Sequence, residues 1–201
     1  MRRLTLDDIA DARAYERERA GFQARIIELK KRRRVGVGPF VTLVFENRDT
    51  IRFQIQEMAR VEKLHTDEAI LHELDTYNPL IPEPGQLSAT LFVELTSKPD
   101  LVEWLPKLVG IETAVELRLA ATGDTVRCEV DAAHLAQLTR EDVTASVHYI
   151  RFRLAPAQVE AFVTGPVELV VAHADYAHGT TLSDETRAEL ATDLGAEEAD
   201  G

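Results

Sequence analysis

Hydrophobic residues recur at three- and four-residue steps along two consecutive stretches near the middle of the chain. In the first, Thr50 to Leu64, this spacing predicts a helix with one buried face. Its apolar stripe consists of Ile51, Ile55, Met58, Val61 and Leu64. A second helix is predicted to start after Thr66, whose hydroxyl can cap it. It ends near Tyr77, because Pro79 disfavours helical backbone at the residue before it.

Alternation of apolar and polar residues predicts several strands in the rest of the chain. The predicted strands are residues 40–46, 87–96, 113–120, 125–130, 146–154 and 167–173, with a turn at 122–124. Short helices are predicted from Lys98, at 132–138, at 156–163 and at 183–194, and residues 173–178 are predicted to be a polar loop. The strands are separated by both turns and helices without regular βαβ alternation. We therefore predict an α+β fold, with a largely antiparallel sheet and helices packed on it.

A long charged helix is predicted for residues 6–34. It has few large apolar residues before Phe22, so its first half is poorly suited to burial in its own core. One interpretation is that it packs on a partner or a second copy of the chain, which predicts a homo-oligomer; the other is an exposed helix held by charge pairs. We divide the chain into this helix (1–34), one α+β domain (35–195) and a disordered acidic tail (196–201).

Composition excludes several classes of protein. The chain has 201 residues and a formal net charge of −12, which argues against binding to nucleic acid. No apolar run approaches the roughly 20 residues that span a bilayer, so no membrane association is expected. The charged start lacks the apolar segment of a signal peptide, which predicts a cytoplasmic protein. Cys128 is the single cysteine, so neither an internal disulfide nor an all-cysteine zinc site is possible.

A basic run at the end of the first predicted helix is a candidate anion site. Arg32, Arg33 and Arg34 are followed by Gly36 and Gly38 in a predicted turn. Arginine side chains and turn N–H groups can together hold phosphate or carboxylate. The spacing matches neither the P-loop nor the dinucleotide fingerprint. The alternative is a basic helix end that complements the helix dipole.

Histidines and carboxylates supply candidate ligands for a divalent metal such as iron, manganese or zinc, the only cofactor that the residues suggest. Glu57 and His65 lie near the junction of the two central helices, and Glu68 and His72 share a face of the second. On the predicted strands, His148 and His173 lie on the more apolar faces, and would approach each other if those strands pair. The alternatives are solvated pairs on a helix and hydrogen-bonded core histidines.

Several stretches resemble a bacterial family of about 200 residues known only as a conserved domain of unknown function. The resemblance is carried by residues 33–39 (RRVGVGP), 45–47 (FEN), 53–58 (FQIQEM), 77–82 (YNPLIP) and 147–152 (VHYIRF). It implies genes beside a rubrerythrin-like peroxidase and an iron–sulfur oxidoreductase of the heterodisulfide-reductase type, and hence a role near peroxide defence or electron transfer. It supplies no catalytic residues. With one cysteine, any cluster would belong to a partner.

Two functions from different classes are consistent with these patterns. The first is an uncharacterised cytoplasmic accessory protein, oligomeric, that acts with a redox or peroxide-defence partner. The second is a metal-dependent enzyme with a histidine and carboxylate site. No nucleophile elbow, zincin motif or Walker loop indicates a named reaction.

Overall fold

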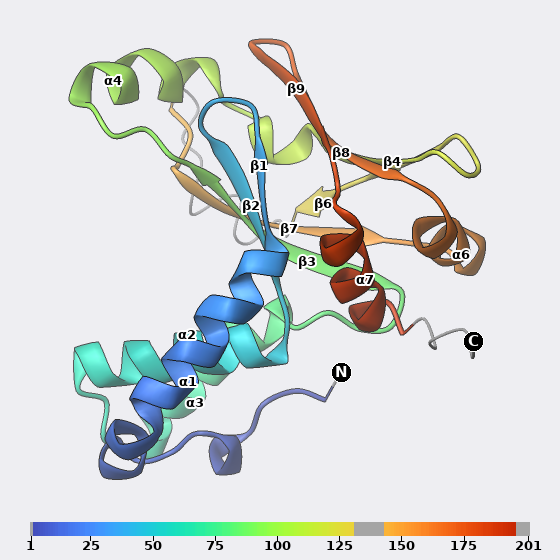
Figure 1. Cartoon of the computed structure of the whole chain (residues 1–201). Helices are drawn as coiled ribbons and strands as arrows, with labels where there is room; N and C mark the ends of the chain where they lie inside the picture. The colour runs from blue at the N-terminus through green and yellow to red at the C-terminus, as the bar shows by residue number, and fades with distance from the viewer. Residues whose placement is uncertain (1, 131–142, 196–201) are drawn as a thin grey trace.

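The computed structural model describes residues 2–130 and 143–195. Two antiparallel sheets face each other across one core, and a layer of helices lies at one end of the molecule (Figure 1). The predicted α+β class and the long N-terminal helix are confirmed. The predicted helix at 132–138 and the predicted tail at 196–201 lie outside the described residues.

The first sheet has the strand order β1-β2-β3-β7-β6, and every neighbouring pair is antiparallel. Its strands are β1 (Arg34–Val37), β2 (Val41–Glu46), β3 (Gln86–Val93), β7 (Val147–Arg153) and β6 (Glu129–Val130). The central strands β2 and β3 are buried along almost their whole length, because the second sheet covers one face and helices cover much of the other.

The second sheet has the order β5-β4-β8-β9 and is also antiparallel. Its strands are β5 (Asp124–Arg127), β4 (Val115–Leu119), β8 (Val167–His173) and β9 (Tyr176–Thr181). Two predictions are wrong here. The predicted strand at 125–130 is split at Cys128 between the two sheets, and the predicted polar loop at 173–178 contains the start of β9. That edge strand is mostly exposed, so it has no hydrophobic alternation to mark it.

The core between the sheets is built from the inward side chains of both. Phe45 and Phe152 face each other with ring centroids 6.4 Å apart, and Leu117 and Leu169 oppose them from the second sheet. Each of these side chains has no exposed surface. Burial of such a side chain contributes about 1.5–3 kcal/mol, so this core holds the two sheets together.

The helical layer contains α1 (Ala12–Arg33), α2 (Arg48–Glu62), α3 (Asp67–Tyr77) and the short 3₁₀ helices η1 (Leu6–Asp8) and η2 (Asn78–Leu80). Elsewhere lie α4 (Lys98–Lys107), η3 (Ile111–Thr113), α6 (Pro156–Thr164) and α7 (Asp184–Asp193). The side chain of Asn47 caps α2 by accepting from the backbone N–H groups of Asp49 and Thr50. Lys63 ends α2 in the left-handed conformation, and Thr66 caps α3.

The N-terminal helix differs from its prediction in extent and in burial. It begins at Ala12 rather than Leu6, because Asp11 is extended and its carboxylate caps the helix through the N–H groups of Arg13 and Ala14. Its first half also packs against its own chain through a few buried side chains. Tyr15 is 1% exposed, and Phe22 packs edge-on against Phe53 of α2. No helix of the described ranges is both long and apolar enough to cross a membrane.

Candidate ligand-binding cavity

A cavity lies in the helical layer, between the N-terminal segment (residues 6–11) and the junction of α2 with α3. It has a volume of about 670 Å³, and apolar groups make up most of its wall. The apolar lining comes from Leu6, Ile9, Ala10, Ala59, Leu64 and Ile70, and the charged lining from Asp11, Arg13, Glu16, Arg60, His65 and Asp67. A cavity of this size and composition is typical of a small-molecule site.

One wall of the cavity is the N-terminal segment, which includes η1, and polar side chains of α2 hold it in place. The amide of Gln56 clamps the backbone of Ala10, since its Oε1 accepts from the Ala10 N–H (2.8 Å) and its Nε2 donates to the Ala10 carbonyl (3.2 Å). Gln56 is 2% exposed. At the other end, Arg48 of α2 forms an ion pair with Asp8 at 2.5 Å. The segment is therefore fixed to α2 at two points.

Behind this wall, Glu57 is the centre of a charged network. Its carboxylate accepts hydrogen bonds from the Tyr15 hydroxyl at 2.7 Å, from Arg19 Nε at 2.8 Å and from Arg60 at 3.1 Å. The hydrogen bonds from Arg19 are the main reason that the pKa of Glu57 falls to about 2. Burial and the same carboxylate raise the pKa of the Tyr15 hydroxyl above its ordinary value. Glu57 is thus a fixed anion that joins α1 to α2.

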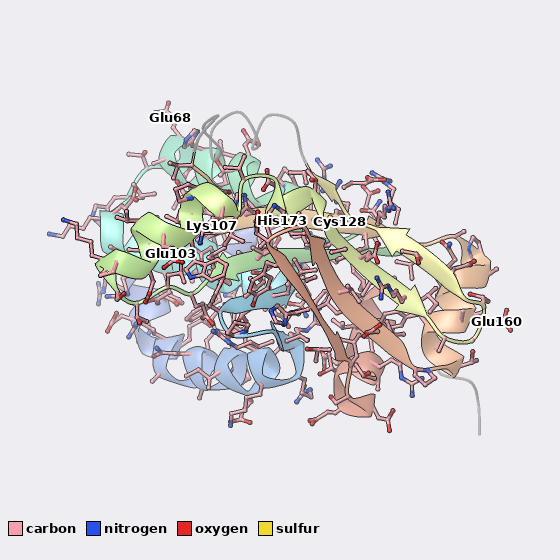
Figure 2. All side chains as sticks on the ribbon, turned by 90° about the horizontal axis from the view of Figure 1, so that it is seen from above. Glu68, Glu103, Lys107, Cys128, Glu160 and His173 are labelled. Atoms are coloured by element: carbon pink, nitrogen blue, oxygen red, sulfur yellow. The ribbon has the colours of Figure 1, made fainter. Side chains whose placement is uncertain are left out.

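The structure does not bring the predicted helical metal ligands together. Glu57 is occupied by Tyr15 and the arginines, while His65 lies at the exposed rim of the cavity. Glu68 and His72 are exposed on α3, and Figure 2 shows Glu68 at the outer edge of the molecule. Among the described residues, no three or more histidine, cysteine, aspartate or glutamate side chains are grouped as a metal would require.

His148 is buried between the sheets, at 2% exposure. Its Nε2 lies 2.9 Å from both the Ala145 carbonyl and the Thr144 hydroxyl, and its Nδ1 lies 3.9 Å from Glu112 Oε2. Because a carbonyl only accepts, Nε2 carries a proton. Desolvation lowers the pKa of His148, which favours the neutral ring. Cys128 donates to the Glu112 carbonyl nearby, and burial raises the pKa of its thiol to about 11, so it is not a reactive thiolate.

His173 lies at the end of β8 in the second sheet, whereas His148 belongs to the first. The strands that carry them do not pair, so the condition for their approach is not met. Both nitrogens of His173 are used locally: Nε2 donates to the Val109 carbonyl (3.1 Å), and Nδ1 accepts from the Asp175 N–H (3.2 Å). These contacts give His173 a structural role.

The three arginines of the basic run, residues 32–34, lie in different environments. Arg33 is 1% exposed and forms two-pronged hydrogen bonds with Asp193 and Glu189 of α7, at 2.6–3.0 Å. Arg32 also binds Glu189, whereas Arg34 forms an ion pair with Glu94. The two glycines lie in different settings as well, with Gly36 inside β1 and Gly38 in the β1–β2 turn against Tyr176 and His178. The arginines therefore join α1 and β1 to carboxylates of the same chain.

Sequence reasoning missed the residues that shape the cavity. Gln56 is not part of the predicted apolar stripe of its helix, yet it is buried and holds the N-terminal segment. Tyr15 and Arg19 gave no signal, because their partner Glu57 lies about 40 residues away. The one signal in the sequence was the position of Gln56, a polar residue directly after Ile55 of the apolar stripe.

Comparisons with known proteins agree with this fold. A crystal structure of a novel protein of unknown function from Burkholderia pseudomallei K96243 is similar to this chain, with a TM-score of 0.88 and 34% sequence identity. The match covers 96% of this chain and 100% of the other. No curated protein matches the chain. The model of the family described as "Protein of unknown function (DUF3501)" matches residues 3–194. The chain therefore belongs to the DUF3501 family.

Proposed function

We propose that this protein is a non-catalytic accessory protein whose helical layer binds an amphipathic small molecule. The observation that carries the proposal is the cavity of about 670 Å³ between the N-terminal segment and the α2–α3 junction. Its apolar wall would bury the hydrocarbon or aromatic part of a ligand. Its rim, with Arg60 and His65 beside Asp67, offers hydrogen-bonding groups for the polar end.

The charged groups near the cavity support binding rather than catalysis. A general base works best with a pKa near the pH of the reaction. Glu57 instead has a pKa of about 2, and its carboxylate accepts hydrogen bonds from three side chains. His65 has no hydrogen bond to an orienting side chain among the described residues, so it lacks the fixed geometry of a catalytic histidine. The metal-dependent enzyme consequently has no specific observation in its favour.

The partner and the oligomeric state belong to the same proposal. The family resemblance supports a redox or peroxide-defence partner, to which the bound molecule would be delivered or presented. Exposed apolar side chains on the helical layer, Ile27 of α1 and Val61 of α2, support self-association or docking there. Light scattering across the micromolar range tests the homo-oligomer, and a monomer at every concentration contradicts it.

The ligand proposal is tested with the fluorescent probe anilinonaphthalene sulfonate, which combines an aromatic part with an anionic group. The native protein should bind it at one site with increased fluorescence. Ala59→Trp places a large side chain into the cavity and should abolish this site. Ala157→Trp, on an exposed position of α6, is the matched control and should leave binding unchanged. Equal binding by both variants contradicts the proposal.

A further inference from the structure

A second, more polar cavity lies on the other side of the helical layer, between the N-terminus, η2 and the first sheet. It has a volume of about 220 Å³, enough for a small ion or metabolite. Three arginines line it, Arg3, Arg151 and Arg153, together with Asn78, Gln86 and Glu83. In a chain with a net charge of −12, three arginines around one small cavity form a local positive site.

The sheet register explains why two of the arginines share this cavity. Arg151 and Arg153 are two residues apart on β7, so their side chains leave the same face of the sheet. They lie opposite Ser88 and Gln86 of β3, respectively. Arg153 forms an exposed ion pair with Glu129 at 2.9 Å. Arg151 is more enclosed and also lines a smaller neighbouring cavity beside Tyr149.

Arg151 has hydrogen-bonding capacity that the described residues do not use. One terminal nitrogen donates to the Pro79 carbonyl at 2.6 Å, which fixes the orientation of the guanidinium. Its Nε is buried and has no hydrogen-bond partner in the described part of the chain. A buried donor without an acceptor is unfavourable, so the charge of Arg151 is less fully compensated than that of Arg153, which has a carboxylate partner. No carboxylate of the described ranges forms an ion pair with Arg151.

Arg3 is held at the rim by the backbone of the next residue. The Asn78 side chain accepts from the Leu4 N–H at 2.8 Å and donates to the Leu4 carbonyl at 3.0 Å. Leu4 is 3% exposed and anchors the strand-like segment in the helical layer. Arg3 is therefore restricted to the mouth of the cavity although its side chain is exposed, and it forms no ion pair with a described carboxylate.

Glu83, the single carboxylate in the lining of this cavity, does not neutralise the arginines around it. Glu83 accepts a hydrogen bond from Gln86 at 3.3 Å, and Glu129 is already paired with Arg153. The charge of Arg3 and Arg151 thus exceeds that of the lining carboxylate by one unit. Guanidinium groups are planar donors that bind oxyanions in two-pronged fashion.

We propose that the cavity lined by Arg3, Arg151 and Arg153 binds a small dianionic oxyanion, of the kind presented by a phosphate group or a dicarboxylate. The anion is held by the guanidinium group of Arg151, which lines the cavity, and is closed in by Arg3 at the mouth. This site is separate from the amphipathic-ligand cavity. The chain before α1 contributes to both, since it carries Arg3 at one and Leu6 and Ile9 at the other.

Calorimetric titration with inorganic phosphate and, separately, with malonate tests the proposal, at an ionic strength matched with sodium chloride. At least one of the two anions should bind with 1:1 stoichiometry. The ratio of the two dissociation constants distinguishes a phosphate site from a dicarboxylate site. In ¹⁵N spectra, binding should shift the Arg151 Nε–H resonance. Absence of binding by both anions beyond the chloride control overturns the proposal.

Variants then locate the site. Arg3→Ala changes an exposed side chain and should weaken binding about tenfold or more, as expected when a charged hydrogen bond is lost. Arg151→Lys keeps the charge but removes the planar guanidinium and should weaken binding to a similar extent. Arg17→Ala, an exposed arginine of α1, is the matched control and should have no effect. Unchanged affinity in both Arg3→Ala and Arg151→Lys, or equal weakening in Arg17→Ala, overturns the assignment.

Discussion

At the scale of single residues, the basic run shows that adjacent side chains of one type can have unrelated roles. Arg33 and Arg34 are neighbours in sequence, but Arg33 is 1% exposed between two carboxylates of α7, whereas the Arg34 side chain is 51% exposed beside Glu94. Removal of one partner from a buried ion pair leaves uncompensated charge, whereas a surface pair contributes little.

We therefore predict that Arg33→Ala lowers the free energy of unfolding by about 3–5 kcal/mol, because Asp193 remains buried without its partner, whereas Glu189 keeps Arg32. Arg34→Ala should lower it by no more than about 1 kcal/mol. Urea denaturation of both variants measures the difference. Equal stability of the two variants would show that the contact between α1 and α7 is not fixed by Arg33.

At the scale of elements, the turn between β1 and β2 links the two sheets. The Tyr176 hydroxyl of β9 donates to the Val37 carbonyl at 2.6 Å and accepts from the N–H groups of Phe40 and Val41 at 3.2 Å. Gly38 has a positive φ of 72°, and a Cβ there would lie 2.5 Å from the Tyr176 oxygen. Glycine is required at this turn, since another residue would be strained and would displace the tyrosine.

Gly38→Ala should consequently destabilise the protein by about 2–4 kcal/mol, from left-handed backbone strain together with overpacking. Gly36→Ala is the matched control, because a Cβ at Gly36 meets nothing within 4 Å. Thermal unfolding should show a clearly lower midpoint for Gly38→Ala and a change within experimental error for Gly36→Ala. Comparable midpoints would mean that the turn does not depend on its contact with β9.

Local sequence patterns predicted the helices and strands better than they predicted which of these elements pack or pair with each other. The two central helices, with Thr66 capping the second, and the inward faces of β7 and β8 follow from periodicity and capping. Periodicity carries no information on which strands pair, so the placement of His148 and His173 in separate sheets was not predictable. The cavity was also missed, because it depends on the clamp between Gln56 and Ala10, 46 residues apart.

At the scale of the whole molecule, stability should depend on acidity through the charged contacts of the helical layer. The folded-state pKa values of Glu57 and Asp8 are both about 2, below the ordinary values of 4.5 and 3.8 for these side chains. Hydrogen bonds from Arg19 lower the pKa of Glu57. For Asp8, burial opposes the shift, but hydrogen bonds from Thr5 and Arg48 outweigh it. A depressed folded pKa stabilises the protein above the unfolded value, and this contribution disappears as pH falls toward the folded value.

We predict that the free energy of unfolding falls between about pH 4.5 and pH 2, and that Glu57→Gln reduces this dependence. The variant should be less stable than the native protein at neutral pH, with the difference shrinking toward pH 2, where Glu57 is protonated. Urea titrations at several pH values measure this. Glu62→Gln, at an exposed position of the same helix, is the control and should keep the native slope. A native slope in Glu57→Gln would contradict the role of Glu57.

The central claim is that the cavity between the N-terminal segment and the α2–α3 junction binds an amphipathic small molecule. The most direct measurement is an NMR titration of ¹⁵N-labelled protein with anilinonaphthalene sulfonate, which locates the probe residue by residue. We expect saturable shifts concentrated at the amides of Ile9, Ala10, Leu64 and Ile70, and the loss of these shifts in Ala59→Trp. Shifts concentrated elsewhere in the protein, or unchanged in Ala59→Trp, would contradict it.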